Sequence, residues 1–98
     1  MYVKIHKSYR VVVAICDSDL IGKRFEENIK QLDVRESFFK GEEKSDSETL
    51  KIMEEARTED ATFNIVGEKS CKLALKCGII AEHGIKRVQG VPFALVLL

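Results

Sequence analysis

Apolar and polar residues alternate at the start of the chain, where the pattern predicts a β-hairpin. Met1, Val3 and Ile5 fall on one face of a first strand, because side chains alternate along an extended backbone. After a short turn, residues 11–16 form an uninterrupted apolar run. A run that is apolar on both faces is typical of a central strand with cover on both sides. We therefore expect the second strand of the hairpin to lie inside the sheet.

The clearest helical pattern begins at Ser45. Ser45 and Glu48 have the spacing of a capping box, in which each side chain accepts a hydrogen bond from the other residue's backbone N–H. Apolar residues follow at helical spacing, namely Leu50, Met53 and Ala56. The pattern predicts a helix that ends near residue 57.

A second helix is predicted over residues 66–76, with Gly78 as its C-cap. Its inward positions are Cys71, Ala74 and Leu75. Short β-prone segments are expected at 31–34, 62–65, 85–88 and 93–98, with a turn at residues 90–92 between the last two. Residues 20–29 fit either a short helix weakened by a glycine or a loop that contains one turn.

Strands before, between and after two helices predict an α+β fold, a small mixed or antiparallel sheet with about two helices packed on it. A chain of 98 residues suits one globular domain over 1–98. Its 45% hydrophobic and 33% charged residues exclude a disordered chain. No apolar run approaches the ~20 residues that span a bilayer, and no signal-peptide pattern is present. We therefore expect a cytoplasmic protein without a membrane partner.

The cysteine and histidine residues give no sign of a metal centre or a catalytic pair. Three cysteines, an odd number, predict reduced thiols rather than a disulfide framework. Cys71 and Cys77 do not have zinc-ligand spacing, and no residue pattern suggests a nucleophile beside a base. We expect no metal, no cofactor and no catalytic residue, so a binding protein is favoured over an enzyme.

The net charge of zero, from 16 basic and 16 acidic residues, excludes a globally basic nucleic-acid binder. It conceals an acidic segment, 40–60, and a basic C-terminal third. Lys69, Lys72 and Lys76 form one stripe on the second predicted helix, and such a stripe, extended by Lys86 and Arg87, can follow a phosphate backbone. Our leading hypothesis is a binding module for RNA or a ribonucleoprotein partner. A solvated helix face is the simpler interpretation of the same stripe.

Two other hypotheses stay open. A small enzyme or ligand-binding protein would have its site between the helix start, 64–69, and the turn, 90–92, where the candidates are Asn64, Gly67, Glu68, Gly90 and Pro92. Asn64 and Pro92 also have a structural interpretation, as a helix cap and as a residue that fixes a turn. An interaction adaptor would instead present the acidic segment to a protein partner. The apolar C-terminus is expected to be an inner strand, with a homodimer through an exposed edge as the alternative.

Several short fragments, taken in order, resemble the small archaeal domain-of-unknown-function family 424. They are residues 1–5, 13–17, 20–25, 38–42, 64–69 and 90–92. The resemblance implies a stand-alone cytoplasmic archaeal protein of about this length, and it supplies no activity. In the family, more polar residues, including a histidine, follow the Gly-Val-Pro turn, whereas Phe93 and Leu95 follow it here. A polar function after that turn is therefore not expected in this chain.

Overall fold

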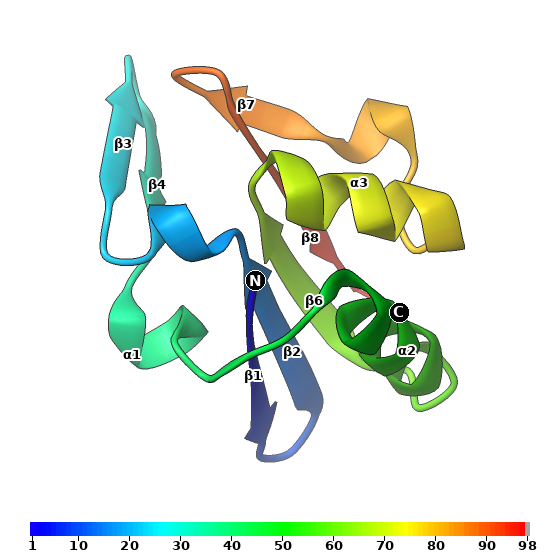
Figure 1. Cartoon of the computed structure of the whole chain (residues 1–98). Coiled ribbons are helices and arrows are strands. Elements are labelled where there is room, and N and C mark those ends of the chain that lie inside the picture. Colours follow the sequence, from blue (N-terminus) through cyan, green and yellow to red (C-terminus); the bar gives the residue numbers. More distant parts are fainter. Residues whose placement is uncertain (98) are drawn as a thin grey trace.

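The computed structural model describes residues 1–97, and its main element is a mixed sheet (Figure 1). Within those residues the sheet has six strands in the order β5-β1-β2-β6-β8-β7. They are β1 (Tyr2–Lys7), β2 (Val11–Cys16), β5 (Glu42–Glu43), β6 (Thr62–Val66), β7 (Lys86–Val88) and β8 (Val91–Val96). Strands β2 and β6 are parallel, and the other neighbours described are antiparallel. The predicted α+β fold with a small mixed sheet is confirmed.

Strand β2 is central, as its continuous apolar sequence predicts. Val13 and Ile15 face one hydrophobic core, and Ala14 and Cys16 face a second core on the other side of the sheet. All four side chains are fully buried. The alternation of a strand thus divides a single apolar run between two cores, and both faces of the sheet must be covered near β2.

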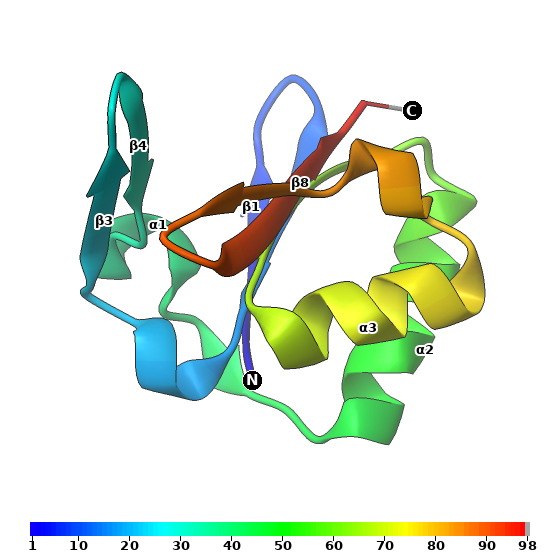
Figure 2. The same ribbon diagram turned by 90° about the horizontal axis from the view of Figure 1, so that it is seen from above.

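Helices α2 (Asp46–Arg57) and α3 (Glu68–Cys77) cover one face of the sheet (Figure 2). Helix α2 starts with the predicted capping box. The Glu48 N–H donates to Ser45 Oγ at 3.2 Å, and the Ser45 N–H donates to Glu48 Oε1 at 2.9 Å. These two bonds satisfy backbone donors that a helix start leaves free. Met53 and Ala56 then carry the buried stripe into the core.

The opposite face is covered in part by the hairpin of β3 (Arg24–Glu27) and β4 (Lys30–Asp33) and by the short helix α1 (Glu36–Phe39) (Figure 2). Leu32 and Val34 point into the second core. Residues 20–29 form neither the helix nor the loop that the sequence left open, because Arg24–Glu27 are strand β3, which a 3-10 turn (Ser18–Leu20) precedes. Gly22, at φ +80°, donates to the Val34 carbonyl and starts the hairpin. Helix α1 was not predicted.

Two predicted boundaries are wrong by about two residues. Helix α3 begins at Glu68 rather than at Val66, which belongs to β6. Strand β8 begins at Val91, and the turn before it consists of Gln89 and Gly90, both at positive φ. Pro92 therefore lies within a strand instead of fixing a turn, and its peptide bond is trans. The C-terminal segment, as far as residue 97, includes the predicted inner strand, which lies between β6 and β7.

The capping box predicts a pH dependence of stability. Hydrogen bonds from the backbone and side chain of Ser45 lower the pKa of Glu48 from its usual value of 4.5. A carboxylate with a lowered folded-state pKa stabilises the fold above the unfolded-state pKa, and this stabilisation is lost as the pH falls through the folded-state value. Thermal unfolding of Glu48→Gln between about pH 6 and pH 3 is therefore expected to show a weaker dependence on pH than that of the wild type.

Glu54→Gln is the matched control, because Glu54 is an exposed carboxylate on the same helix. It should retain the pH dependence of the wild type. Identical pH profiles for Glu48→Gln and the wild type would contradict the proposed role of the capping box.

Candidate functional site

The carboxylate of Asp17 caps helix α3. Asp17 directly follows β2 and is 7% exposed. Its Oδ2 accepts from the Lys69 N–H at 3.0 Å, and its Oδ1 accepts from the N–H and the hydroxyl of Ser70 at 2.8 and 2.7 Å. These are the donors that an anion at a helix N-terminus would use. These N–H groups at the start of α3 are therefore occupied by a side chain of the protein itself.

Gly67 makes this close approach feasible. It lies between β6 and α3 with φ +110°, a region that only glycine adopts readily. A Cβ at this position would overlap the carboxylate of Asp17. Its N–H donates to the Pro92 carbonyl at 2.8 Å, while the Asp17 N–H donates to the Val66 carbonyl. The ends of β2 and β6 and the start of β8 thus meet at one point beside α3.

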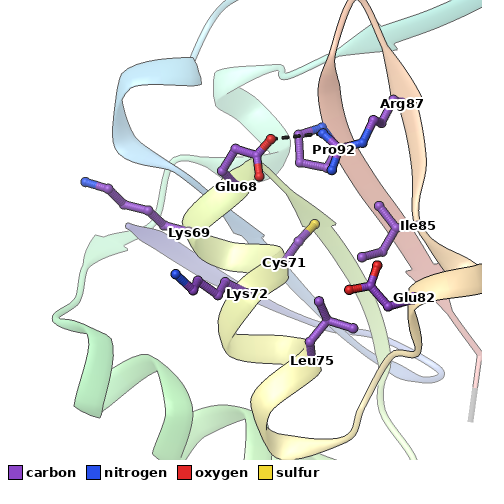
Figure 3. Close-up of a pocket in the computed structure, with 9 residues that line it drawn as sticks. All are labelled: Glu68, Lys69, Cys71, Lys72, Leu75, Glu82, Ile85, Arg87 and Pro92. Atoms are coloured by element: carbon purple, nitrogen blue, oxygen red, sulfur yellow. Dashed lines mark hydrogen bonds and ion pairs between the residues drawn. The ribbon is translucent and has the colours of Figure 1, made fainter.

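Two hollows border this junction. One, of about 290 Å³, lies between the segment 17–20, the start of α3 and the turn before β8. The other, of about 360 Å³, lies between α3 and β7 (Figure 3). Both are lined by Glu68, Lys69 and Pro92. In Figure 3, Glu68 reaches across to Arg87, and the two side chains form an ion pair of 2.9 Å.

The structure brings together seven of the ten sequence-predicted site residues at these hollows. The residues that line one or both of them are Gly67, Glu68, Lys69, Lys72, Arg87, Gly90 and Pro92. The Arg87 Nη1 also donates to the Gly90 carbonyl at 3.0 Å and to Glu68. The helix start and the turn that the sequence analysis considered as two sides of a site are therefore neighbours in space.

The lysine stripe lies along the exposed side of α3. Lys69, Lys72 and Lys76 are all exposed, and within residues 1–97 none of them pairs with a carboxylate. Figure 3 shows Lys69 and Lys72 extending away from β7, whereas Cys71 and Leu75 turn toward it. The stripe therefore forms a rim beside the larger hollow, whose lining includes the apolar Leu75 and Ile85 together with the carboxylate of Glu82.

Two predicted site residues lie elsewhere. Lys86 precedes Arg87 in β7, and since neighbours in a strand face opposite ways, it shares the face of Val88, which belongs to the second core. Asn64 is in the middle of β6 and lines a groove on that same second face. Asn64 is therefore not the cap of α3 that the sequence suggested, because the helix starts four residues later.

The acidic and basic segments lie side by side. Helix α2, from the acidic segment, packs next to α3 on the same face of the sheet (Figure 2). Arg57 near the end of α2 donates from Nη1 to the Cys77 carbonyl at 2.8 Å. The two helices thus place opposite charges on adjacent parts of one surface.

The buried thiols are not activated. Burial raises the pKa of Cys16 to about 12, and Asp17 beside it acts in the same direction. Burial likewise raises the pKa of Cys71, at the larger hollow, to about 11, with further contributions from Asp17 and Glu68. A nucleophilic cysteine needs a lowered pKa, so neither thiol has the chemistry of a catalytic residue. Among residues 1–97, no three His, Cys, Asp or Glu side chains are grouped to hold a metal ion.

Asp17 is the residue of this junction that the sequence analysis missed. An acidic residue directly after a buried strand is a common place for a functional or capping carboxylate. The signal in the sequence is the glycine before α3, since a helix start without a side-chain cap of its own needs a hydrogen-bond acceptor from elsewhere in the chain for its free N–H groups. Gly67 provides no such cap.

Comparisons with known proteins identify relatives without assigning an activity. Residues 5–98 match a family described as "Protein of unknown function (DUF424)". A solved structure titled "Crystal structure of an uncharacterized conserved protein from Methanopyrus kandleri" is 28% identical, with a TM-score of 0.85 over 98% of this chain and 90% of that chain. No curated protein matches. Within residues 1–97, no helix is long and apolar enough to cross a membrane.

The contact between Gly67 and Asp17 predicts that an alanine substitution at Gly67 lowers the free energy of unfolding much more than one at Gly90. Gly67→Ala adds a Cβ at positive φ that overlaps Asp17, and we expect a loss of unfolding free energy on the order of 3 kcal/mol. Gly90→Ala is the matched control, because Gly90 has φ +79° but no atom near its Cβ position. There we expect only the backbone cost, about 1 kcal/mol. Urea unfolding measures both, and equal losses would contradict the role of Gly67 at the junction.

Proposed function

We propose that this chain, which belongs to the DUF424 family of proteins of unknown function, is a non-enzymatic binding module for RNA or a ribonucleoprotein partner. The observation that supports the proposal is the lysine stripe of α3. Its three ammonium groups point to solvent on one side of a helix, and within residues 1–97 no carboxylate neutralises them. Successive turns of a helix place such charges at a spacing that can follow phosphates.

The surroundings of the stripe restrict how an RNA would approach it. The acidic helix α2 lies on one side and repels a polyanion. The larger hollow lies on the other side, where Arg87 is held by Glu68 at the edge. The proposal therefore places the phosphate backbone along α3, and it places the neighbouring sugar or base over Leu75 and Ile85, next to the carboxylate of Glu82.

The proposal predicts a salt dependence set by three phosphate contacts. Each contact with single-stranded RNA contributes a slope of about −0.7 in log K against log salt, so affinity should fall about 20-fold between roughly 50 and 200 mM salt. Charge reversal at all three positions, in Lys69→Glu, Lys72→Glu and Lys76→Glu together, should abolish binding of a fluorescent single-stranded RNA at low salt.

The control is a triple reversal at exposed lysines outside the stripe, namely Lys23, Lys30 and Lys51. It changes the net charge by the same amount, and it should reduce affinity much less because only non-contacting charges change. Equal effects of the two triple variants, or no binding at low salt, would refute RNA binding through α3. Pull-down from native lysate with and without nuclease separates RNA from a protein partner of the acidic segment.

The hollows at the start of α3 favour a second candidate, a ligand-binding protein. Their volumes of about 290 and 360 Å³ lie at the lower end of the range of small-molecule sites, ~300–1,000 Å³. They adjoin through shared residues, and glycine backbone is exposed at the turn before β8. This arrangement suits a small molecule that lies against Gly67 and contacts the exposed backbone of Gly90.

The second candidate predicts where small molecules would bind. In a fragment screen followed by ¹H–¹⁵N NMR, the amide signals of Gly67 and Gly90 should shift together and saturate. Arg87→Ala removes the side chain that connects Glu68 to the Gly90 carbonyl, and it should change the affinity of these fragments at least several-fold. Shifts scattered over the surface, or fragment affinities unchanged in Arg87→Ala, would argue against this site.

A further inference from the structure

The face of the sheet turned away from α2 and α3 carries a groove that the lysine stripe does not reach. It has a volume of about 390 Å³ and lies between β4 and α1 on one side and β6 and β8 on the other. The large apolar side chains at its walls include Leu32, Phe38, Phe39, Phe93 and Leu95. Leu95 is 60% exposed, so the groove opens to solvent at β8. The hairpin and α1 thus cover only part of this face.

Asn64 lies at this groove, and it is an unusual residue for its position. It stands in the middle of β6, paired in register with Ala14 of β2 and with Leu95 of β8. Asparagine is depleted in strands, where β-branched and aromatic residues pack better. Within residues 1–97, no side-chain hydrogen bond of the chain involves its amide, and the amide is open to solvent. The amide is therefore available to a ligand in the groove.

The chemistry of the groove indicates which ligand can replace solvent at that amide. An Asn side chain both donates and accepts, and it can form two hydrogen bonds with the edge of a nucleobase, as it does with adenine. Phe38 and Phe93 are half-buried aromatic side chains at the walls of the groove, and aromatic faces are favourable contacts for bases. The ring of Phe38 is held in place by stacking on His6, with centroids 4.7 Å apart.

A cation also lies at the groove. Arg35 is 72% exposed, and it meets Asp33 only through Nε, at 3.7 Å from Oδ2. Its two terminal guanidinium nitrogens have no carboxylate partner within residues 1–97. Such a fork matches a phosphate group. The groove therefore combines an apolar wall, an accessible amide, a partly free guanidinium and the Asp33 carboxylate beside that guanidinium.

We propose that this groove binds a nucleobase, whose edge hydrogen-bonds to Asn64. Phe38 and Phe93 contact the ring, and Arg35 pairs with the phosphate attached to it. The volume of about 390 Å³ is sufficient for one mononucleotide unit and lies within the range of small-molecule sites. The groove and the stripe of α3 lie on opposite faces of the sheet, so this proposal stands independently of RNA binding by the lysines.

NMR titration of the full chain tests the proposal with three probes. Adenosine 5′-monophosphate represents a free nucleotide, a short single-stranded oligoadenylate represents a base within a strand, and ribose 5-phosphate lacks the base. We expect saturable shifts of the Asn64 side-chain NH₂ signals with one or both of the first two probes. The probe that binds more tightly identifies the source of the base. Equal shifts with ribose 5-phosphate, or no shift with any probe at millimolar concentration, would overturn the proposal.

Substitution of Asn64 distinguishes an effect on ligand binding from an effect on stability. Asn64→Val places a better strand former in β6, so the variant should unfold at the same or a higher urea concentration. It should nevertheless bind the adenine probe about fivefold more weakly or worse, because the paired hydrogen bonds to the base are lost. Unchanged affinity in Asn64→Val would overturn the proposal.

A pair of leucine variants tests the location. Leu95→Arg places a long charged side chain at the groove and should weaken binding of the adenine probe, whereas Leu97→Arg changes a leucine outside its lining that is 70% exposed, against 60% for Leu95. Equal affinities of the two variants for the adenine probe would contradict the location of the binding site in this groove. The triple lysine variant should keep the wild-type affinity for adenosine monophosphate, which distinguishes failure of this proposal from failure of RNA binding through α3.

Discussion

The carboxylate of Asp17 connects the sheet to helix α3, and the geometry of the candidate site depends on that connection. The residue is more than 50 positions before its partners Lys69 and Ser70, so it acts only after β2 and β6 have paired in parallel. It then fixes where α3 starts, which sets the positions of the lysine stripe and of both hollows. This contact requires glycine at position 67, because any side chain there would displace the carboxylate of Asp17. A helix N-terminus usually free to attract anions is thereby neutralised from within.

That neutralisation limits what the basic surface can do. Since the backbone N–H groups of Lys69 and Ser70 are used by Asp17, a phosphate at α3 is held chiefly by side chains. Lysine contacts are flexible point charges, without the fixed geometry of backbone amides or of an arginine fork. The surface is therefore suited to sequence-independent contact with a phosphate backbone rather than to selective capture of one phosphate group.

The sequence predicted the parts of the fold that depend on neighbours in the chain. Ser45 and Glu48 are three residues apart, and the helix they start was predicted with its boundaries; the apolar run of β2 likewise identified the central strand. Contacts between distant segments were not accessible in the same way. The role of Asp17, the hairpin of β3 and β4 and the location of Asn64 all depend on which strands pair. The start of α3 was misplaced because Val66 is apolar in either a strand or a helix, and only its register with Cys16 shows that it belongs to β6.

The arrangement of α2 and α3 shows where the opposite charges behind the net charge of zero lie. The acidic and basic helices do not lie on opposite faces, where each would act alone, but next to each other on one face. Opposite charges on adjacent helices cancel at distances beyond a Debye length, about 10 Å at 0.1 M salt, and remain distinct close to the surface. The protein therefore attracts a charged partner only weakly at long range. The separate acidic and basic surfaces act on the partner only when it is close to them. It is then oriented, because a polyanion is attracted to α3 and repelled by α2. A chain with this arrangement favours a defined binding orientation over fast electrostatic capture.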